Sequence, residues 1–244
     1  MLHSSSAGVE LFARYAHAPN ALGFCGPTSG IGTTEPEIRA AARRFSGAWP
    51  YLQVLARLTG IDDPLDGRLV EAYWLGRDLG IDNAAFGREL LAVIGPQAGP
   101  YWSHLTPQLL ATGAPDHGFH VFGVYPWSRL LGRGMDAQPL HVLDNCRIRW
   151  GTVVAATDGV VTLEVRHLTW DGRALGLGEP VVEVLQQSHL HAGILRESGF
   201  AATAGTLVAL HWDRFCDVLT PAQVADLEQS TLRELDATNA RLVH

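Results

Sequence analysis

The sequence predicts an α+β fold, in which an all-helical N-terminal domain is followed by a small β-barrel and a single C-terminal helix. Apolar residues recur at helical spacing over about the first 140 residues. Short β-branched segments bounded by turn signals come next, and helical spacing returns after Thr220-Pro221. We therefore expect two domains, a helical domain over residues 1–140 and a β-rich domain over residues 141–244.

Start and stop signals divide the first region into helices. Residues 9–18, VELFARYAHA, have apolar side chains at helical spacing, and Pro19 is predicted to end this helix. Thr34 is a predicted N-cap, because Pro36 and an acidic residue follow in the first turn. Further helices are predicted where a proline or an aspartate begins an apolar run and a glycine ends it, in PYLQVLARLTG, DGRLVEAYWLG and DNAAFGRELLAVIG.

The second region contains four segments typical of strands: RIRWGTVVAAT, GVVTLEVRHLTW, PVVEVLQQS and TLVALHW. Asp158-Gly159 predicts the bend of a hairpin between the first two segments, since Asp-Gly suits a two-residue turn. Thr220 is the predicted N-cap of the closing helix, AQVADLEQSTLRELDATNARL.

Composition excludes several classes of partner. With 47% hydrophobic and 18% charged residues in 244, the chain can bury a substantial core. A formal net charge of −7 offers no basic face for phosphates, so we expect no nucleic-acid partner. No apolar run reaches the roughly 18 residues of a membrane span, and the N-terminus lacks the basic and apolar parts of a secretory signal. A cytoplasmic protein without a membrane partner is therefore expected.

The three cysteines, Cys25, Cys146 and Cys216, are too few and too scattered for a disulfide framework. Such thiols are usually buried as small apolar side chains, and less often act as ligands or nucleophiles. The phosphate-binding loops and the nucleophile motif G-x-S-x-G are absent from the sequence, as are paired C-x-x-C motifs. Whether the protein is an enzyme therefore stays open at this point.

Two short motifs frame the β-rich region. Cys146, Gly151 and Val153 form a C-x-x-x-x-G-x-V pattern at its start. Near its end, Gly205, Val208 and His211 form G-x-x-V-x-x-H, and a helix rich in acidic residues follows. In this order the motifs resemble the HypC/HupF family of [NiFe]-hydrogenase maturation chaperones, over residues 143–238. The whole chain, with its FCGP, EAYWLG, HVFGVYPW and ALHWD blocks, is also similar to an uncharacterised family associated with hydrogenase gene clusters.

The resemblance implies an OB-like β-barrel with a C-terminal helix. Members of the HypC/HupF family carry iron as Fe(CN)2CO to the hydrogenase large subunit precursor, together with the HypD scaffold. Carried over, Cys146 supplies the thiolate that holds iron, and His211 is a nearby second ligand or proton partner. Arg147 and Arg149 are expected to lower the pKa of Cys146.

This chain departs from the family in two respects. Cys146 is internal and has no free amine, whereas in the family the cysteine becomes the first residue. The segment RHLTWDGRALGLGEPVV also lengthens the middle of the barrel. The alternatives are that Cys146 is a buried thiol at the domain junction and that His211 donates to backbone. Cys216 lies outside the motif, and packing is its predicted role.

The helical half contains three further candidate metal ligands. Cys25 lies between glycines in the long loop PNALGFCGPTSGIGTT, where backbone can approach a ligand closely. His117 and His120 would share one face of a helix, and with Cys25 or His17 they would form a mixed thiolate and imidazole site. Alternatively, His117 caps a helix and His120 packs beside aromatic residues. The many aromatic residues of this half are predicted core. A haem between them is an alternative, which their spacing does not require.

Three hypotheses follow. The first is an accessory protein of [NiFe]-hydrogenase maturation that binds iron or docks to the large subunit precursor or a HypD-like scaffold. The second is a metal- or haem-dependent enzyme with its site around Cys25, His117 and His120. The third is an interaction protein without a metal.

Overall fold

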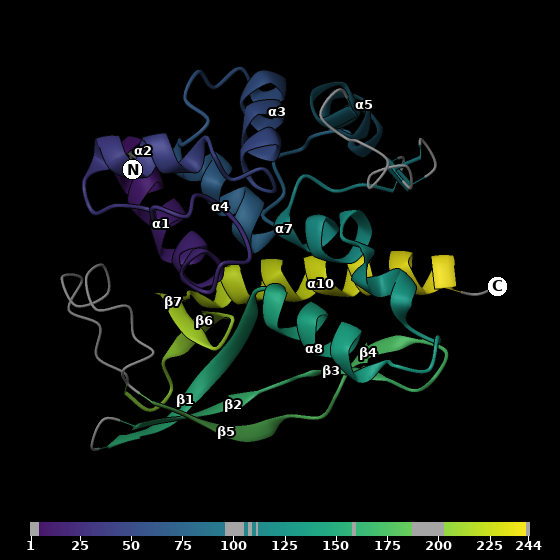
Figure 1. The fold of residues 1–244 in the computed structure, drawn as a ribbon. Helices are drawn as coiled ribbons and strands as arrows, with labels where there is room; N and C mark the ends of the chain where they lie inside the picture. The colour runs from purple at the N-terminus through teal and green to yellow at the C-terminus, as the bar shows by residue number, and fades with distance from the viewer. Residues whose placement is uncertain are drawn as a thin grey trace.

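Figure 1 shows the computed structural model of the chain, which describes residues 5–95, 105–106, 109–110, 112–157, 160–186 and 203–242. The helical elements before the sheet are α1 (Ser5–Ala21), α2 (Glu35–Ala42), α3 (Trp49–Thr59), α4 (Gly67–Leu75), α5 (Asn83–Ile94), α7 (His117–Phe119), the π-helical turn η3 (His120–Val124), the 3-10 turn η4 (Pro126–Leu130) and α8 (Ala137–Cys146). The chain ends with the long helix α10 (Pro221–Leu242).

The predicted caps are present. Glu37 accepts the backbone N–H of Thr34 at the start of α2, at 2.9 Å. Asp66 and Asp82 accept backbone N–H groups at the starts of α4 and α5. The hydroxyl of Thr220 accepts the backbone N–H of Gln223 at the start of α10, at 3.2 Å. The predicted end of the first helix at Pro19 is wrong, because α1 continues through this proline to Ala21.

The strands form an open antiparallel sheet in the order β5-β2-β1-β6-β7. They are β1 (Arg149–Thr157), β2 (Val160–Val165), β5 (Val181–Gln186), β6 (Leu207–His211) and β7 (Arg214–Val218), with a separate ribbon of β3 (Leu168–Trp170) and β4 (Leu175–Leu177). Thr157 pairs with Val160, as expected for the predicted hairpin, although its bend at 158–159 lies outside the described residues. The long middle segment of the β region supplies the β3–β4 ribbon.

The expected OB-like barrel is not confirmed, because β5 and β7 lie at opposite edges of the sheet and do not pair in the described part of the chain. Side chains of all five strands nevertheless meet in one cluster, from Leu185 on β5 to Phe215 on β7. The other face of β6 and β7 is buried as well, since Ala209 and Cys216 belong to the core of the helical region. The helices thus cover a face that a free barrel would expose to water.

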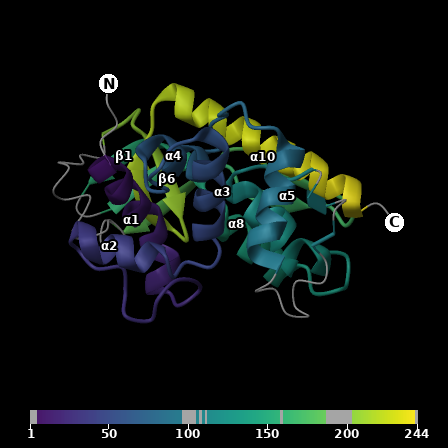
Figure 2. The ribbon, with the colours of Figure 1, turned by 90° about the horizontal axis from the view of Figure 1, so that it is seen from above.

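The helical and β-rich regions share this main core. It joins α1, α3 and α4 to Ile148, Ala209, Cys216 and Leu219. In Figure 1, α10 runs between the helices drawn above it and the strands β3 and β4 drawn below, and it contacts α4, α7, η3 and β4. Figure 2 shows the same helix extending along one side of the molecule. The expected boundary between residues 140 and 141 falls within α8.

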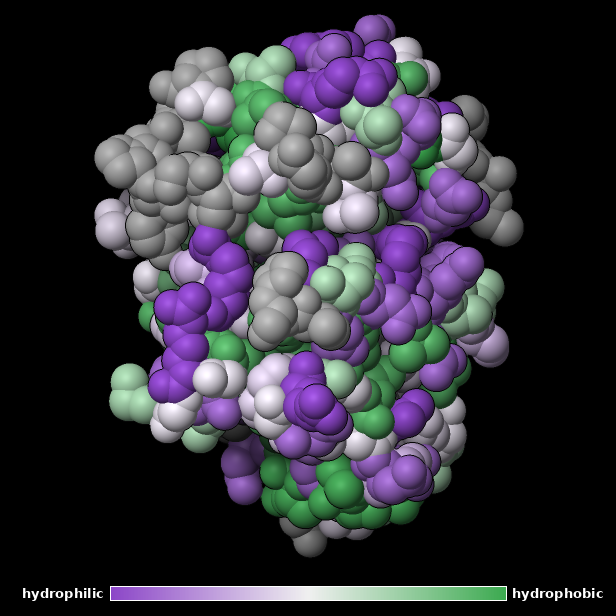
Figure 3. All heavy atoms as spheres, turned by 90° about the vertical axis from the view of Figure 1, so that its right-hand side faces the viewer, coloured by the Kyte–Doolittle hydropathy of each residue, from purple (hydrophilic) through white to green (hydrophobic). Residues whose placement is uncertain are grey.

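Hydrophilic and hydrophobic side chains are interspersed on the face shown in Figure 3, and hydrophobic residues gather at its lower end. In Figure 1 the sheet lies at this end of the molecule. The edge strand β5 exposes Val182 and Val184, by 63% and 59%. Within the described part of the chain, every helix is too short or too polar to cross a membrane.

Candidate metal centre

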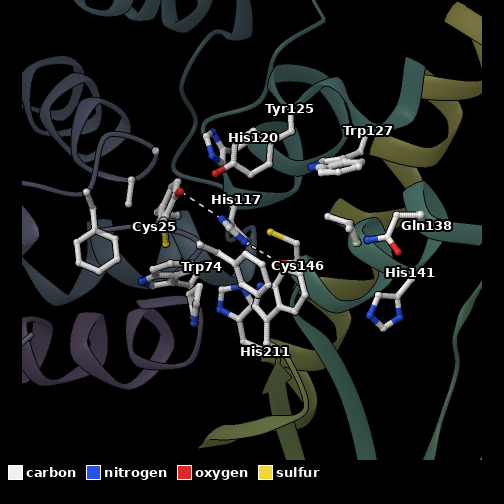
Figure 4. A pocket seen from close by; sticks show the side chains of 18 residues that line it. Cys25, Trp74, His117, His120, Tyr125, Trp127, Gln138, His141, Cys146 and His211 are labelled. Carbon is white, nitrogen blue, oxygen red and sulfur yellow. Dashed lines mark hydrogen bonds between the residues drawn. The ribbon is translucent and has the colours of Figure 1, made fainter. Parts of the chain in front are cut away.

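A cavity of about 410 Å³ lies where the helices meet β6. Its walls are mainly aromatic and apolar, and four histidines and two cysteines also line it: His117, His120, His141, His211, Cys25 and Cys146. None of the described residues that line it is Asp, Glu, Lys or Arg. Figure 4 shows this arrangement, with the Cys146 sulfur directed toward the ring of His117.

Three of these residues form a tight cluster. His117 begins α7, Cys146 ends α8 and His211 ends β6. One donor atom from each of the three side chains lies within 4.8 Å of the others, and all three residues are buried. A single transition-metal ion bound between them would need bonds of about 2.0–2.3 Å to nitrogen and sulfur, so a small inward movement of these side chains brings them into range.

The register of β1 and β6 explains why Cys146 and His211 meet. These strands are antiparallel, with Gly151 opposite Val208 and Arg149 opposite Leu210. Beyond the last pair, the backbone N–H of Trp212 donates to the carbonyl of Asn145 at 2.9 Å. The residues just before β1 therefore lie beside those that end β6. The two sequence motifs thus lie on neighbouring strands, and Cys146 and His211 meet at the same end of this strand pair.

The imidazole of His211 has the orientation of a metal ligand. Its Nδ1–H donates to the backbone carbonyl of Tyr15 at 2.8 Å, and Nε2 is buried without a hydrogen-bond partner among the described residues. A histidine that donates one ring N–H to a carbonyl presents the lone pair of its other nitrogen. The predicted bond of His211 to backbone is therefore present, and it leaves Nε2 available for a metal.

The carbonyl of Tyr15 is available because of Pro19. In an uninterrupted α-helix, this carbonyl would accept the N–H of residue 19, four positions later. Proline has no N–H, and Pro19 lies inside α1. The proline also lines the cavity. Helix α1 thus continues past Pro19 and leaves the carbonyl of Tyr15 free to accept the hydrogen bond that orients His211.

His117 has both ring nitrogens engaged. Nε2 lies 2.8 Å from the carbonyl of Cys146, and Nδ1 lies 3.2 Å from the hydroxyl of Tyr73. Because a carbonyl can only accept, Nε2 carries the proton, and Nδ1 accepts from the Tyr73 hydroxyl. Metal binding through Nδ1 would displace this hydroxyl while keeping the bond to Cys146. Asp116, and not His117, caps α7 by accepting the N–H of Phe119.

Burial keeps the cluster uncharged without a metal. Burial lowers the pKa of His211 to about 4, against the smaller opposing effects of the Tyr15 carbonyl, which accepts from Nδ1, and of the nearby Cys146 carbonyl, which forms no hydrogen bond with Nε2. Burial also lowers the pKa of His117 well below its usual value, with the neighbouring histidines adding to this effect. The pKa of Cys146 is raised to about 12, first by burial and then by the nearby Cys25. Both imidazoles are therefore neutral ligands at neutral pH, whereas Cys146 must lose a proton to bind a metal.

The expected influence of Arg147 and Arg149 on the thiol is wrong, since the pKa of Cys146 is raised and not lowered. Arg147 is bound to the carboxylate of Asp144 at 2.9 Å. Arg149 pairs with the carboxylates of Glu183 and Asp213. Both guanidinium groups are buried, and these carboxylates balance their charge.

The remaining two sequence candidates, Cys25 and His120, line the same cavity outside the tight cluster. The Asn20 side chain holds the Cys25 loop by donating to the carbonyls of Cys25 and Pro27, both at 2.9 Å. Burial raises the pKa of Cys25 to about 12. The ring of His120 lies edge-on to Tyr51, with 5.6 Å between ring centroids, and burial lowers its pKa to about 4. The predicted packing of His120 beside aromatic residues is thus present.

Several residues of the site were not singled out by the sequence. Tyr15 and Pro19 orient His211, Tyr73 holds His117, and Gln138 and His141 lie where the cavity wall reaches the surface. The one sequence signal was Pro19 within an otherwise helical pattern, which marks a carbonyl that a helix would leave free. His17, by contrast, does not line the cavity.

The fold and the cluster define an α+β protein with a buried His-Cys-His constellation beside an aromatic cavity. The chain belongs to a family described as a family of unknown function (DUF6390), which it matches over residues 4–244. No curated protein and no solved structure matches the chain significantly.

Proposed function

We propose that this protein binds a transition-metal ion through His117, Cys146 and His211. The buried Nε2 of His211 carries the proposal, because it has no partner among the described residues and belongs to a cluster with a thiol and a second imidazole within 4.8 Å. An unpaired buried polar atom is costly, and a metal ion would satisfy it. Thiolate and imidazole together suit iron and zinc better than they suit magnesium or calcium.

We further propose that the metal is iron and that the protein is an accessory protein of [NiFe]-hydrogenase maturation, acting in the cytoplasm. This part of the proposal rests on the resemblance to the HypC/HupF family, whose two motifs supply Cys146 and His211. The cluster shared by all five strands is what an opened OB-like barrel would retain. Fe(CN)2CO is the form of iron that the resemblance implies, and the large subunit precursor or a HypD-like scaffold is the implied partner.

A metal- or haem-dependent enzyme is the second candidate function. The cavity favours it, because about 410 Å³ lies beside the three donors and a metal ion alone does not need that space. In this case Cys25 and His120 would contribute to the site from the cavity wall.

Metal analysis of anaerobically purified protein tests these proposals. We expect about one metal ion per chain in the wild type, lost in both Cys146→Ala and His211→Ala and retained in His141→Ala, a histidine of the cavity wall outside the cluster. Iron that disappears with Cys146→Ala supports the accessory protein, whereas iron or haem that disappears only with Cys25→Ala supports the enzyme. Absence of metal from the wild type and from a co-purified partner complex contradicts both.

The role in maturation needs a second test in a host that carries the gene and a [NiFe]-hydrogenase. Deleting the gene should lower hydrogenase activity and the iron content of its large subunit. Wild-type protein should restore both, and the Cys146→Ala variant should not. Unchanged hydrogenase after deletion would contradict this role and leave the metal site standing.

A further inference from the structure

We propose that the cavity beside the metal binds a small, mainly aromatic molecule whose single anionic donor atom completes the coordination of the metal. This inference rests on the proposed metal at His117, Cys146 and His211, bound as a divalent ion without cyanide or carbonyl ligands. It goes further by naming the chemical class of the second ligand and the walls that recognise it.

The size of the cavity and the number of protein donors support an open coordination site. Structural zinc sites are closed by four protein ligands, whereas sites that act on a second molecule keep a position free. Here three donors lie within 4.8 Å of one another. The adjoining cavity of about 410 Å³ falls in the usual range for small-molecule sites, about 300–1,000 Å³.

The walls favour a flat apolar body. Trp74 lies 4.8 Å from the ring of His117 and 5.8 Å from that of His211, measured between centroids. Tyr125 and Trp127 line the cavity as well, as does Phe45. Aromatic faces and edges attract a planar ring more specifically than aliphatic walls do.

Charge limits the donor atom to a monoanion. A divalent ion with one thiolate, from Cys146, and two neutral imidazoles carries one net positive charge. Among the described residues, the lining includes no ionised carboxylate, ammonium or guanidinium group that would balance it. One anionic donor neutralises the site in an apolar environment, where an uncompensated charge is costly. A phosphorylated molecule would instead bring excess negative charge without a basic partner.

The cavity opens to solvent between two groups of residues. Gln138 and His141, both exposed, lie one turn apart on the face of α8 that leads to Cys146. Phe24, which is 55% exposed, stacks on Trp212 with 4.0 Å between ring centroids. In Figure 4, Gln138 and His141 lie on the opposite side of the cluster from Cys25. A ligand that reaches the metal from the side of Gln138 and His141 places its far end beside the polar groups of these two residues.

The test has two steps, so that the two proposals fail separately. In the first step, Co²⁺ is titrated into metal-free protein, and its visible absorption reports thiolate and imidazole coordination. In the second step, the cobalt protein is titrated with benzoate, acetate and inorganic phosphate. We expect benzoate to shift the cobalt spectrum and to bind at least about tenfold more tightly than acetate, because only benzoate buries a ring. Phosphate should bind more weakly than benzoate.

Two variants connect binding to the cavity. Gln138→Trp changes an exposed residue at the mouth, and Val142→Phe fills the interior next to it. Both should keep the cobalt spectrum and weaken benzoate binding by about tenfold or more. Val142→Ala is the matched control and should retain benzoate binding, because it removes volume where Val142→Phe adds it.

The outcomes are separable. Failure of cobalt to bind overturns both the metal site and this inference. A cobalt spectrum that does not respond to benzoate, as expected if Cys25 closes the coordination sphere, overturns only the inference. Equal affinities for benzoate and acetate, or unchanged benzoate binding in both filled variants, also overturn it.

Discussion

At the scale of single residues, the orientation of the candidate ligands depends on their hydrogen-bond partners. His211 is held by the carbonyl of Tyr15, which is free because Pro19 donates no hydrogen bond. Partners of this kind usually affect metal affinity by about 10–100-fold. Pro19 is therefore expected to affect metal affinity through Tyr15 and His211, without contacting the metal itself.

Replacing Pro19 by alanine tests this role. The new N–H would donate to the carbonyl of Tyr15 and compete with His211 for it. We expect the Pro19→Ala variant to bind Co²⁺ about tenfold more weakly. The free energy of unfolding of the metal-free protein should stay the same or increase, since the helix gains a hydrogen bond. Pro36→Ala, in the first turn of α2, is the matched control and should leave cobalt affinity unchanged. Equal affinity in both variants would remove Pro19 from the site.

The pKa values predict how metal binding depends on pH. At pH 6–9, Cys146, with a pKa of about 12, is a thiol, and His211, with a pKa of about 4, is already neutral. Binding should therefore release one proton, from Cys146, and the apparent affinity should rise about tenfold per pH unit over this interval. Competition titrations and proton-release measurements in weak buffer check this. Release of two protons at pH 6 would mean that a histidine is protonated before the metal binds.

The sequence indicated residues that the fold brings to one cavity, but it did not indicate their environment. All five candidate ligands line one cavity. The two short motifs pointed to Cys146 and His211, and local spacing pointed to His117 and His120. The raised pKa of Cys146 could not be predicted, because the positive charges beside it in sequence are balanced by carboxylates. Arg149 pairs with Glu183 and Asp213, which lie far away in sequence, and Arg147 pairs with Asp144.

At the scale of elements, the pairing of β1 with β6 sets the distance between two of the donors. Gly151 lies opposite Val208 at the centre of this pairing. A Cβ atom at Gly151 would lie 2.6 Å from Cγ1 of Val165 and 2.8 Å from the carbonyl oxygen of Glu164. Such contacts require β1 and β2 to separate. The glycine of the C-x-x-x-x-G-x-V motif thus has a packing role in the sheet.

The variant Gly151→Ala should therefore be destabilised. We expect a loss of about 1–3 kcal/mol in the free energy of unfolding, measured by urea denaturation, together with weaker cobalt binding. Gly95→Ala is a suitable control, because a Cβ atom there would approach Leu91 only to 3.6 Å and the backbone is helical. A stable Gly151→Ala protein with wild-type cobalt affinity would contradict the proposed dependence of the metal site on the close packing of β1 at Gly151.

The elements were predicted where local signals are strong. The caps at Asp66, Asp82 and Thr220 determine where three helices begin, and β-branched runs gave the strands of the sheet. Closure of the barrel could not be judged from these signals. Whether β5 and β7 pair depends on what covers the sheet, and helices far away in sequence bury Ala209 and Cys216.

At the scale of the whole molecule, α10 connects the helical region, the sheet side and the candidate site. Its Glu234 is fully buried, and Nε of Arg233 lies 3.5 Å from one carboxylate oxygen, although neither oxygen has a hydrogen-bond partner among the described residues. Arg233 pairs with Asp116, which caps α7 directly before His117. Asp116 and Glu234 thus lie where the C-terminal helix packs against α7, the element that carries the candidate ligand His117.

The charge of Glu234 predicts a pH-dependent stability of the whole protein. Burial, followed by the negative charge of Asp116, raises the pKa of Glu234 to about 8, while Arg233 and Arg241 oppose this rise. The folded state therefore holds a proton that the unfolded state releases near its usual pKa of about 4.3. A raised folded pKa means that this stabilisation is fully present below about pH 4.3 and is lost progressively as the pH approaches 8.

Glu234→Gln should remove this loss, because the amide stays neutral at every pH. Wild-type protein should lose stability on the order of 1 kcal/mol per pH unit between pH 5 and 8, relative to the variant. Urea denaturation of both proteins at pH 5, 6.5 and 8 measures the difference, with Glu228→Gln on the half-buried outer part of α10 as control. If the difference between wild type and Glu234→Gln does not change with pH, Glu234 is ionised in the folded protein. Arg233 and Arg241 would then stabilise the negative charge of Glu234. In that case ion pairs, and not a buried neutral acid, would hold α10 against the rest of the protein.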